Sequence, residues 1–411
     1  MKYIVLLGDG MADYPLSELG GKTPLEFAET PNMDTMAAKG TVGLIDTIPD
    51  GFAPGSDVAN LSVLGYDPKE CHTGRAPLEA ASMGVDLAPD DVAFRCNLVT
   101  LDSAGSETVM EDFTSGHITS EEASLIIGTL NKELASPFID FHSGVGYRHL
   151  MVYKGGPVSL ETTPPHDIIG RSIAGWLPKG EGSGEISSLM GRSHDILKDH
   201  PVNLARVSKG KKTADSIWLW GEGRAPRMEP ITTRYGIKGG MISAVDLLNG
   251  IGVYAGLEIL HVEGATGYID TDYKGKAKKA LEYLIDGDFV FIHVEAPDEM
   301  GHEGDIKGKI KAIEDFDEKV VGTMLSGTKA MGNFRVIVLS DHPTPISLKT
   351  HSSDPSPFVV LSSIDGENIV TGSAFNEISA KNAGIMASPG CLLMDYFMGN
   401  WRKFIEEKER V

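Results

Sequence analysis

Short apolar runs recur along the chain, and each of them ends in a polar residue or a glycine. Five stand out: YIVLLGD at 3–9, SIWLWGEG at 216–223, DFVFIHVEAPD at 288–298, FRVIVLSDH at 334–342 and PFVVLSS at 357–363. Helical patterns lie between several of these runs, in GGMISAVDLLNGIGVYAGL, YKGKAKKALEYLI and DIKGKIKAIEDFDEKVVGTML. Buried strands that alternate with helices predict an α/β fold with a mostly parallel sheet.

The middle of the chain has a different pattern. DDVAFRCNLVTL and YRHLMVY are typical of half-exposed strands, and TSEEASLIIGTLNKEL opens with a capping box from Thr119 to Glu122. The segments PKGEGSG and SKGKKTADS are predicted to be a flexible loop and a return linker. We therefore expect a smaller α+β domain at 91–210, inserted into a core made of 1–90 and 211–411.

Composition excludes several classes of partner. The formal net charge is −21, from 37 basic and 58 acidic residues. This charge argues against binding nucleic acid or an anionic membrane through the electrostatic field of the whole protein.

The apolar part of the N-terminus, YIVLL, is short and ends near Asp9 rather than at a small-residue cleavage site, so it is interpreted as a strand. Cys71, Cys96 and Cys391 are far apart, which fits a reducing cytoplasm.

Four segments carry residue types that do chemistry. LLGDGMAD holds Asp9, and FAPGSDVANLSVLGY places Ser56 after Pro-Gly at a predicted helix start. EAPDEMGH holds Asp298 and His302, and LSDHPTPISLKTHS holds Asp341, His342 and His351. Asp9, Asp298 and Asp341 follow predicted parallel strands, and ligands bind at that edge of an open α/β sheet. Segments far apart in the sequence can therefore converge there.

The number of these side chains suits two divalent metal ions. One ion could be held by Asp298, His302 and His351, and the other by Asp9, Asp341 and His342. Mixed oxygen and nitrogen ligands favour Mn²⁺ or Zn²⁺, and imidazole makes Mg²⁺ less favoured. Coordination to a cation, or a helix N-terminus, would stabilise the alkoxide of Ser56 and make it a nucleophile.

Each of these residues alone has a commoner explanation. An aspartate at a strand end is more often a turn or capping residue, and a lone histidine such as His302 is more often structural. Ser56 alone is most simply interpreted as a helix N-cap. The four segments together, in this order, are harder to explain as packing.

These segments resemble a known family. They are closely similar to motifs of the archaeal-type, cofactor-independent phosphoglycerate mutases of the alkaline phosphatase superfamily. The matching segments are LLGDGMAD, PGSDVANLSVLGYDP, TGRAPLEAAS, EAPDEMGH and SDHPTP with KTHSSDPSPF. The resemblance runs nearly end to end. It implies an alkaline-phosphatase-like core with a smaller inserted domain, in agreement with the pattern above.

The resemblance also implies a reaction. Ser56 attacks the phosphate of 3-phosphoglycerate, becomes phosphoserine and returns the phosphoryl group to the 2-hydroxyl, without 2,3-bisphosphoglycerate. One metal ion is implied at Asp298, His302 and His351, and the other at a set of four residues. That second set is Asp9, Ser56, Asp341 and His342.

Two alternatives share the metal ligands and the serine. A bacterial branch with the same motif variants has been proposed to be a homoserine kinase, and PGSDVANLSVLGYDP and VAFRCNLVT are close to that branch. A metal-dependent phosphatase would differ only in letting water reach the phosphoserine, and an inserted domain that excludes water favours transfer. A P-loop is rejected, because the Gly-Lys-Thr at 21–23 needs a glycine at the position of Leu16.

Arginine forks are the best ligands for the phosphate and carboxylate of such a substrate. The candidates lie in glycine-rich turns or near strand ends, and Arg75 is favoured because it is near Ser56 in the sequence. The set is Arg75, Arg95, Arg148 and Arg224, with Arg227 beside the last. Surface solvation is the alternative for each of them. Asp112, His117 and His149 are possible acid–base groups, and nothing in the sequence selects one.

Overall fold

The computed structural model describes residues 1–102, 107–364 and 366–408. Over these residues the chain divides into two compact units, one of 1–72 with 227–411 and one of 73–226. The second unit is wider at both ends than the expected insert, 91–210, and it includes the expected return linker SKGKKTADS. Helix α5 (Ala76–Ser82) packs Ala76 and Ala80 against Ala93 and Leu150 of the sheet in this unit, which explains the earlier start.

The first unit is built on an eight-stranded sheet in which β14 alone runs antiparallel to its neighbours. The strands in spatial order are β11 (Glu258–Ile259), β10 (Gly239–Ile242), β12 (Phe289–Val294), β1 (Lys2–Gly8), β13 (Phe334–Leu339), β14 (Ser356–Ser362), β2 (Thr41–Ile45) and β15 (Met386–Ala387). The expected α/β class with a mostly parallel sheet is confirmed. All six residues of β12 are buried, as expected for a central parallel strand covered on both faces.

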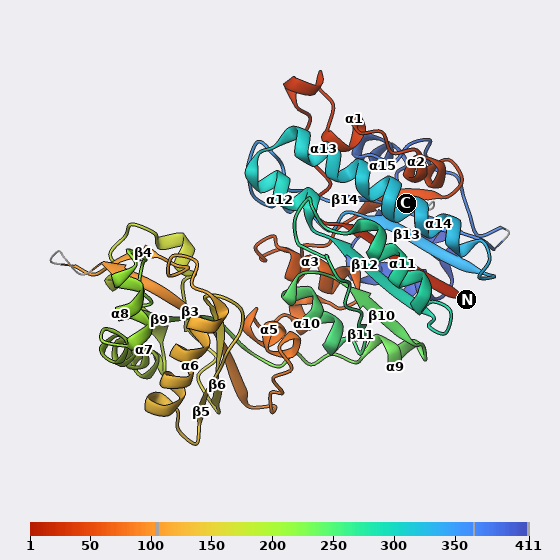
Figure 1. Cartoon of the computed structure of the whole chain (residues 1–411). Coiled ribbons are helices and arrows are strands. Elements are labelled where there is room, and N and C mark those ends of the chain that lie inside the picture. Colours follow the sequence, from red (N-terminus) through yellow and green to blue (C-terminus); the bar gives the residue numbers. More distant parts are fainter. Residues whose placement is uncertain (103–106, 365, 409–411) are drawn as a thin grey trace. The chain divides into compact units, whose positions relative to one another are not determined.

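Helices flank this sheet (Figure 1). They are α1 (Pro24–Phe27), α2 (Pro31–Ala37), α3 (Ser56–Val63), α4 (Pro68–Cys71), α9 (Ile231–Tyr235), α10 (Asp246–Tyr254), α11 (Tyr273–Tyr283), α12 (Ala296–Glu303), α13 (Ile306–Asp315), α14 (Gly322–Thr328), α15 (Glu377–Asn382), α16 (Leu393–Met398) and α17 (Trp401–Lys408). Within the residues described, no helix is both long and apolar enough to cross a membrane.

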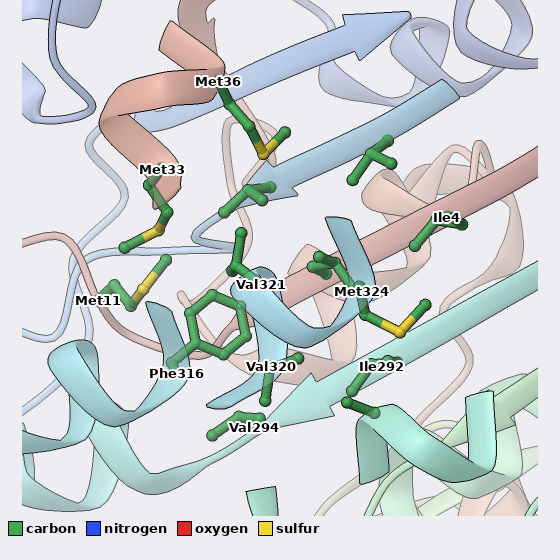
Figure 2. Close-up of a cluster of buried hydrophobic side chains, with 14 of the residues drawn as sticks. Ile4, Met11, Met33, Met36, Ile292, Val294, Phe316, Val320, Val321 and Met324 are labelled. Atoms are coloured by element: carbon green, nitrogen blue, oxygen red, sulfur yellow. The ribbon is translucent and has the colours of Figure 1, made fainter. Parts of the chain in front are cut away.

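The main core of the first unit lies between the sheet and the helices α2, α11, α13 and α14. Figure 2 shows Phe316, Val320 and Met324 among the side chains of Ile4 on β1 and Ile292 on β12. Each of these side chains is fully buried, and burying one of this size stabilises a fold by roughly 1.5–3 kcal/mol. This packing fixes the strands whose ends carry the candidate site.

Two helical predictions need correction. The segment 305–325 was expected to be one helix, but a π-helical turn, Phe316–Val321, separates α13 from α14. In the segment 239–257, the first four residues form strand β10, and only Asp246–Tyr254 is helical. A Cβ added at Gly239 would clash with Leu257, and one added at Gly240 would clash with Leu260 and Tyr283. The two glycines therefore let this short strand pack against its neighbours.

The second unit carries an antiparallel five-stranded sheet. Its strands are β3 (Asp91–Asp102), β4 (Val109–Asp112), β5 (Ile139–His142), β6 (Arg148–Lys154) and β9 (Ser216–Arg224), and β7 (Leu160–Glu161) pairs with β8 (Lys179–Gly180). Its helices are α5 (Ala76–Ser82), α6 (Ser120–Leu134), α7 (Ser183–Leu197) and α8 (Pro201–Ser208). The capping box from Thr119 to Glu122 is present. The strands expected to be half-exposed, β3 and β6, are mostly buried because helices cover them.

Candidate metal and nucleophile site

Three adjacent parallel strands bring the predicted aspartates to one edge of the large sheet. β1 lies between β12 and β13, and the backbone N–H of Asp9 donates to the carbonyl of Val294 at 2.9 Å. Asp9 directly follows β1, and Asp341 comes two residues after β13. Asp298 lies in the first turn of α12, which begins just after β12. The carboxyl ends of these strands therefore converge as the sequence predicts.

Asp298, His302 and His351 form the first group of side chains. Nε2 of His302 lies 3.2 Å from Oδ2 of Asp298, and Nε2 of His351 lies 3.5 Å from Oδ1 of the same carboxylate. The two Nε2 atoms are 2.9 Å apart. Residues 298 and 302 are one turn apart on α12, so both side chains lie on one face of that helix.

Asp9, Asp341 and His342 form the second group, and all three are completely buried. Nε2 of His342 lies 3.5 Å from Oδ1 of Asp9 and 3.6 Å from Oδ2 of Asp341. The rings of His342 and His351 have centroids 4.2 Å apart, so the two groups are neighbours. The donor atoms of the second group lie within 4.8 Å of one another, and so do those of Asp298, His342 and His351, so each of these two sets is within reach of one cation.

Ser56 is the first residue of α3, and its Oγ lies 3.2 Å from Nε2 of His342. The side-chain amide of Asn60, one turn later, donates to the Ser56 carbonyl and to Oδ2 of Asp341, each at 2.9 Å. The other carboxylate oxygen, Oδ1 of Asp341, accepts from the backbone N–H of Gly10 at 3.2 Å. The helix that carries the serine is thus tied directly to one of the aspartates.

The carboxylates of this site have few positive partners. Burial, followed by the charges of Asp341, Glu295 and Asp298, raises the pKa of Asp9 well above its usual value. Burial would also raise the pKa of Asp298, but hydrogen bonds from His302 and His351 hold it well below its usual value. A hydrogen bond to Asp298 in turn raises the pKa of His302 to about 9.

His293 and Glu295 also lie in the site, and they were not predicted as site residues from the sequence. His293, on β12, places Nε2 2.8 Å from Oδ2 of Asp9 and 3.3 Å from Oε2 of Glu295. Its Nδ1 lies 3.1 Å from the hydroxyl of Ser243. The signal available in the sequence was a single histidine inside the apolar run FVFIHV, where an unpaired imidazole is costly.

The donor set fits divalent cations. In the described part of the chain, the ion pairs of Asp9, Glu295, Asp298 and Asp341 are made to histidines and not to lysine or arginine. Oδ1 of Asp9 and Oε2 of Glu295 are buried without a hydrogen-bond partner. Buried carboxylates need a compensating positive charge, and carboxylate with imidazole suits Mn²⁺ or Zn²⁺.

Three of the predicted substrate arginines lie near one another in the second unit. Burial lowers the pKa of Arg95, and the charges of Arg75 and Arg148 lower it further. Arg95 is already engaged, because it pairs with Glu79 through two nitrogens, at 3.1 and 3.0 Å, and lies 4.0 Å above the ring of Trp220. Arg148 is exposed.

The remaining candidates are less distinctive. Arg224 lies at the end of β9, 3.7 Å from Asp90, and Arg227 belongs to the first unit.

The three candidate acid–base groups lie in the second unit. Burial lowers the pKa of His149 to about 4, and its Nδ1 accepts from the backbone N–H of Gly144. His117 is exposed with φ of 50°, and Asp112 accepts from Thr114. These contacts do not select one acid–base group.

Comparison with known proteins identifies the family. The model of the 2,3-bisphosphoglycerate-independent phosphoglycerate mutase family matches residues 37–203. A protein of Geobacter sulfurreducens, named a probable 2,3-bisphosphoglycerate-independent phosphoglycerate mutase, is 52% identical over 97% of this chain and 100% of its own length. A protein of Methanosarcina barkeri, named a 2,3-bisphosphoglycerate-independent phosphoglycerate mutase, is 53% identical over 94% of this chain and 96% of its own length.

Solved structures agree over nearly the whole chain. A protein of Pyrococcus horikoshii superposes with a TM-score of 0.79 and 30% identity, covering 98% of this chain and 97% of that one. The cofactor-independent phosphoglycerate mutase of Thermoplasma acidophilum superposes with a TM-score of 0.65 and 25% identity, covering 97% and 99%. The chain belongs to the family of 2,3-bisphosphoglycerate-independent phosphoglycerate mutases.

Proposed function

We propose that this enzyme interconverts 3-phosphoglycerate and 2-phosphoglycerate through a phosphoserine at Ser56, with two bound divalent metal ions and without 2,3-bisphosphoglycerate. The observation that carries the proposal is the position of the Ser56 hydroxyl. Its Oγ lies 3.2 Å from Nε2 of His342, beside two groups of carboxylates and imidazoles, in a chain that shares about half its residues with named mutases. Membership of this family implies divalent metal ions.

We assign one ion to Asp298, His302 and His351 and the other to a set of four residues. That set is Asp9, Ser56, Asp341 and His342. Mn²⁺ is the first choice, with Zn²⁺ or Mg²⁺ as alternatives. Bound ions would offset the charge of the substrate phosphate and favour the ionised serine.

The residues of the chain position the reacting groups. Ser56, at the first position of α3, loses its hydroxyl proton, and its Oγ forms a bond to the phosphorus while the bond from phosphorus to the 3-oxygen of glycerate breaks. The leaving oxygen takes up a proton. The 2-hydroxyl then loses a proton and attacks the phosphoserine, which frees Oγ. Asn60 holds the Ser56 carbonyl and Asp341 through one amide group, which keeps the serine aligned with the second ligand set.

The unit at 73–226 is proposed to take part in binding the substrate. Arg75 and Arg148 lie close enough to Arg95 to affect its pKa, so positive charge is concentrated there in an otherwise acidic protein. Arg224 remains a further candidate. The substrate is a small phosphorylated acid, which matches this local charge. The three cysteines are free thiols, which supports the cytoplasmic location that we propose.

The test is phosphorus NMR of the purified enzyme with Mn²⁺ and 3-phosphoglycerate, in the absence of ATP and 2,3-bisphosphoglycerate. We expect 2-phosphoglycerate to appear with the native enzyme and not with Ser56→Ala, which should still bind metal. Inorganic phosphate as the sole product would overturn the proposal in favour of a phosphatase. No reaction, with turnover of homoserine and a phosphoryl donor instead, would favour the kinase alternative.

A further inference from the structure

Thr344 lies between the two groups of candidate metal ligands and contacts both. Its side-chain hydroxyl donates to Oδ1 of Asp298, which belongs to the first group. The same oxygen lies 3.3 Å from Nδ1 of His342, which belongs to the second group. Thr344 is completely buried, so these contacts do not compete with bulk water.

The backbone of Thr344 is fixed from two sides. Its N–H donates to the carbonyl of Ala12 at 3.2 Å, and its carbonyl accepts from Nζ of Lys309 at 2.8 Å. Lys309 is itself buried and paired with Asp13 at 2.7 Å. The backbone of Thr344, in the segment after β13, is therefore held against the loop that follows β1.

The side chain is equally confined. A Cβ added at Gly10 would come within 2.6 Å of the Thr344 hydroxyl, and one added at Gly301 would come within 2.8 Å of its methyl group. Both glycines leave room that the threonine fills. The hydroxyl is thus held in place by packing as well as by hydrogen bonds, as accurate positioning requires.

The hydrogen-bond chemistry gives this chain of contacts a direction. A hydroxyl has one proton to donate, and an ionised carboxylate can only accept. The hydroxyl proton therefore goes to Asp298, and a lone pair of the same oxygen accepts from Nδ1–H of His342. This arrangement leaves the lone pair on Nε2 of His342, the atom that faces Ser56, Asp9 and Asp341.

We propose that Thr344 is a positioning residue that couples the two metal sites, by fixing the tautomer of His342 and the orientation of Asp298. The inference rests on the proposed function, because it assumes that both groups bind metal. Outer hydrogen-bond partners of metal-binding histidines commonly act in this way. Here one hydroxyl serves ligands of two different ions.

The test compares Mn²⁺ binding by metal-free native enzyme and by Thr344 variants, using isothermal titration calorimetry. Thr344→Val keeps the shape and removes the hydroxyl, and Thr344→Ser keeps the hydroxyl and removes the methyl group. Thr344→Ala provides a second hydroxyl-free variant in case the valine variant does not fold. The matched control is Thr328→Val, because Thr328 is also completely buried and its hydroxyl bonds only to carbonyls within its own helix.

We expect the valine variant to bind Mn²⁺ about 10–100-fold more weakly at both sites. The serine variant should bind close to native, and the Thr328 control should bind close to native even if its thermal midpoint falls. Native affinity at either site in Thr344→Val or Thr344→Ala would overturn the coupling role. A serine variant as weak as the valine variant would overturn it as well, because packing would then be the cause. Two intact sites in the native enzyme with unaffected variants would leave the proposed function standing, whereas no Mn²⁺ binding by the native enzyme would overturn both.

Discussion

Nε2 of His302 faces Nε2 of His351 at 2.9 Å, although the two residues are 49 positions apart in the sequence. Two neutral imidazoles can make such a contact only if one ring donates its proton to the other. Both nitrogens also lie beside the carboxylate of Asp298. A single cation between the three side chains would satisfy all of them, and this convergence is the strongest geometric support for a metal at this position.

Metal removal should lower both activity and stability. After exhaustive chelation we expect no mutase activity and a lower thermal midpoint, because the buried carboxylates lose their compensating charge. Added Mn²⁺ should restore both, and at a free concentration 100 times the dissociation constant the gain is about 2.7 kcal/mol. Differential scanning fluorimetry across a Mn²⁺ series checks this. A midpoint independent of Mn²⁺ would refute the ligand sets.

The metal-free enzyme should become less stable as the pH rises from about 7 to about 9. The pKa values of Asp9 and Glu295 are raised by burial, and that of His302 is raised to about 9 by its bond to Asp298. These groups bind protons more tightly when folded, so their contribution is present below the unfolded pKa values, about 4 and about 6.5, and is lost as the pH passes the folded values. The lowered pKa of Asp298 acts only at lower pH.

The corresponding measurement is the thermal midpoint in a chelator from about pH 7 to about pH 9, the folded value of His302. Burial lowers the pKa values of His293 and His342, so their contribution rises with pH only up to about 6.5, the unfolded value, and is constant in this range. We expect a steady fall in the native protein and a shallower fall in Asp9→Asn and in His302→Gln. Saturating Mn²⁺ should flatten the curve, since bound metal replaces the protons. A midpoint that rises over this range in the chelator would contradict the assignment.

The buried pair of Lys309 and Asp13 should be important for stability. Nζ of Lys309 contacts Oδ2 of Asp13 at 2.7 Å and also donates to the carbonyls of Ala12 and Thr344, and both side chains are fully buried. Lys309→Met leaves a buried carboxylate without its partner, so we expect a loss of about 3–5 kcal/mol in the free energy of unfolding by urea.

Lys403→Met is the matched control for that variant. Lys403 is 61% exposed and lies 3.5 Å from Glu407 on the same helix. Exposed pairs of this kind contribute little, and the expected change is below about 1 kcal/mol. Equal losses in the two variants would show that the buried pair has no special role.

Arg95 and Arg148 should respond differently to replacement by alanine. Arg95 is paired with Glu79 and stacked on Trp220, so Arg95→Ala should lower the thermal midpoint of the enzyme. Arg148 is exposed, so Arg148→Ala should leave the midpoint near native and raise KM for 3-phosphoglycerate. Midpoints and steady-state kinetics of both variants check this. An unchanged KM in Arg148→Ala would remove this residue from the substrate-binding set.

The sequence predicts the position of the main aspartates because buried parallel strands have a strong local pattern. Asp9 and Asp341 each follow an apolar run, and parallel strands place such positions at a common edge. His293 has no comparable signal, since its partner, Asp9, is 284 residues away in the sequence. Thr344 likewise resembles any loop threonine until Asp298 and His342 are placed around it.

Tertiary contacts also decide features that the local sequence does not indicate. The strand β10 is too short for a periodic pattern and merges with the apolar run of α10. Arg95 is predicted to bind an anion, and the sequence does not indicate that it also pairs with Glu79 on α5. The unit boundary depends on the packing of α5 against that sheet, which local composition does not indicate.

A phosphoserine at Ser56 is tested by stopping the reaction in acid during turnover of 3-phosphoglycerate and mapping phosphorylation by mass spectrometry. We expect a phosphoryl group on the peptide that contains Ser56, formed only with metal and absent from Ser56→Ala. Rapid formation of 2-phosphoglycerate with no phosphate on Ser56, or with phosphate on another residue, would contradict this expectation.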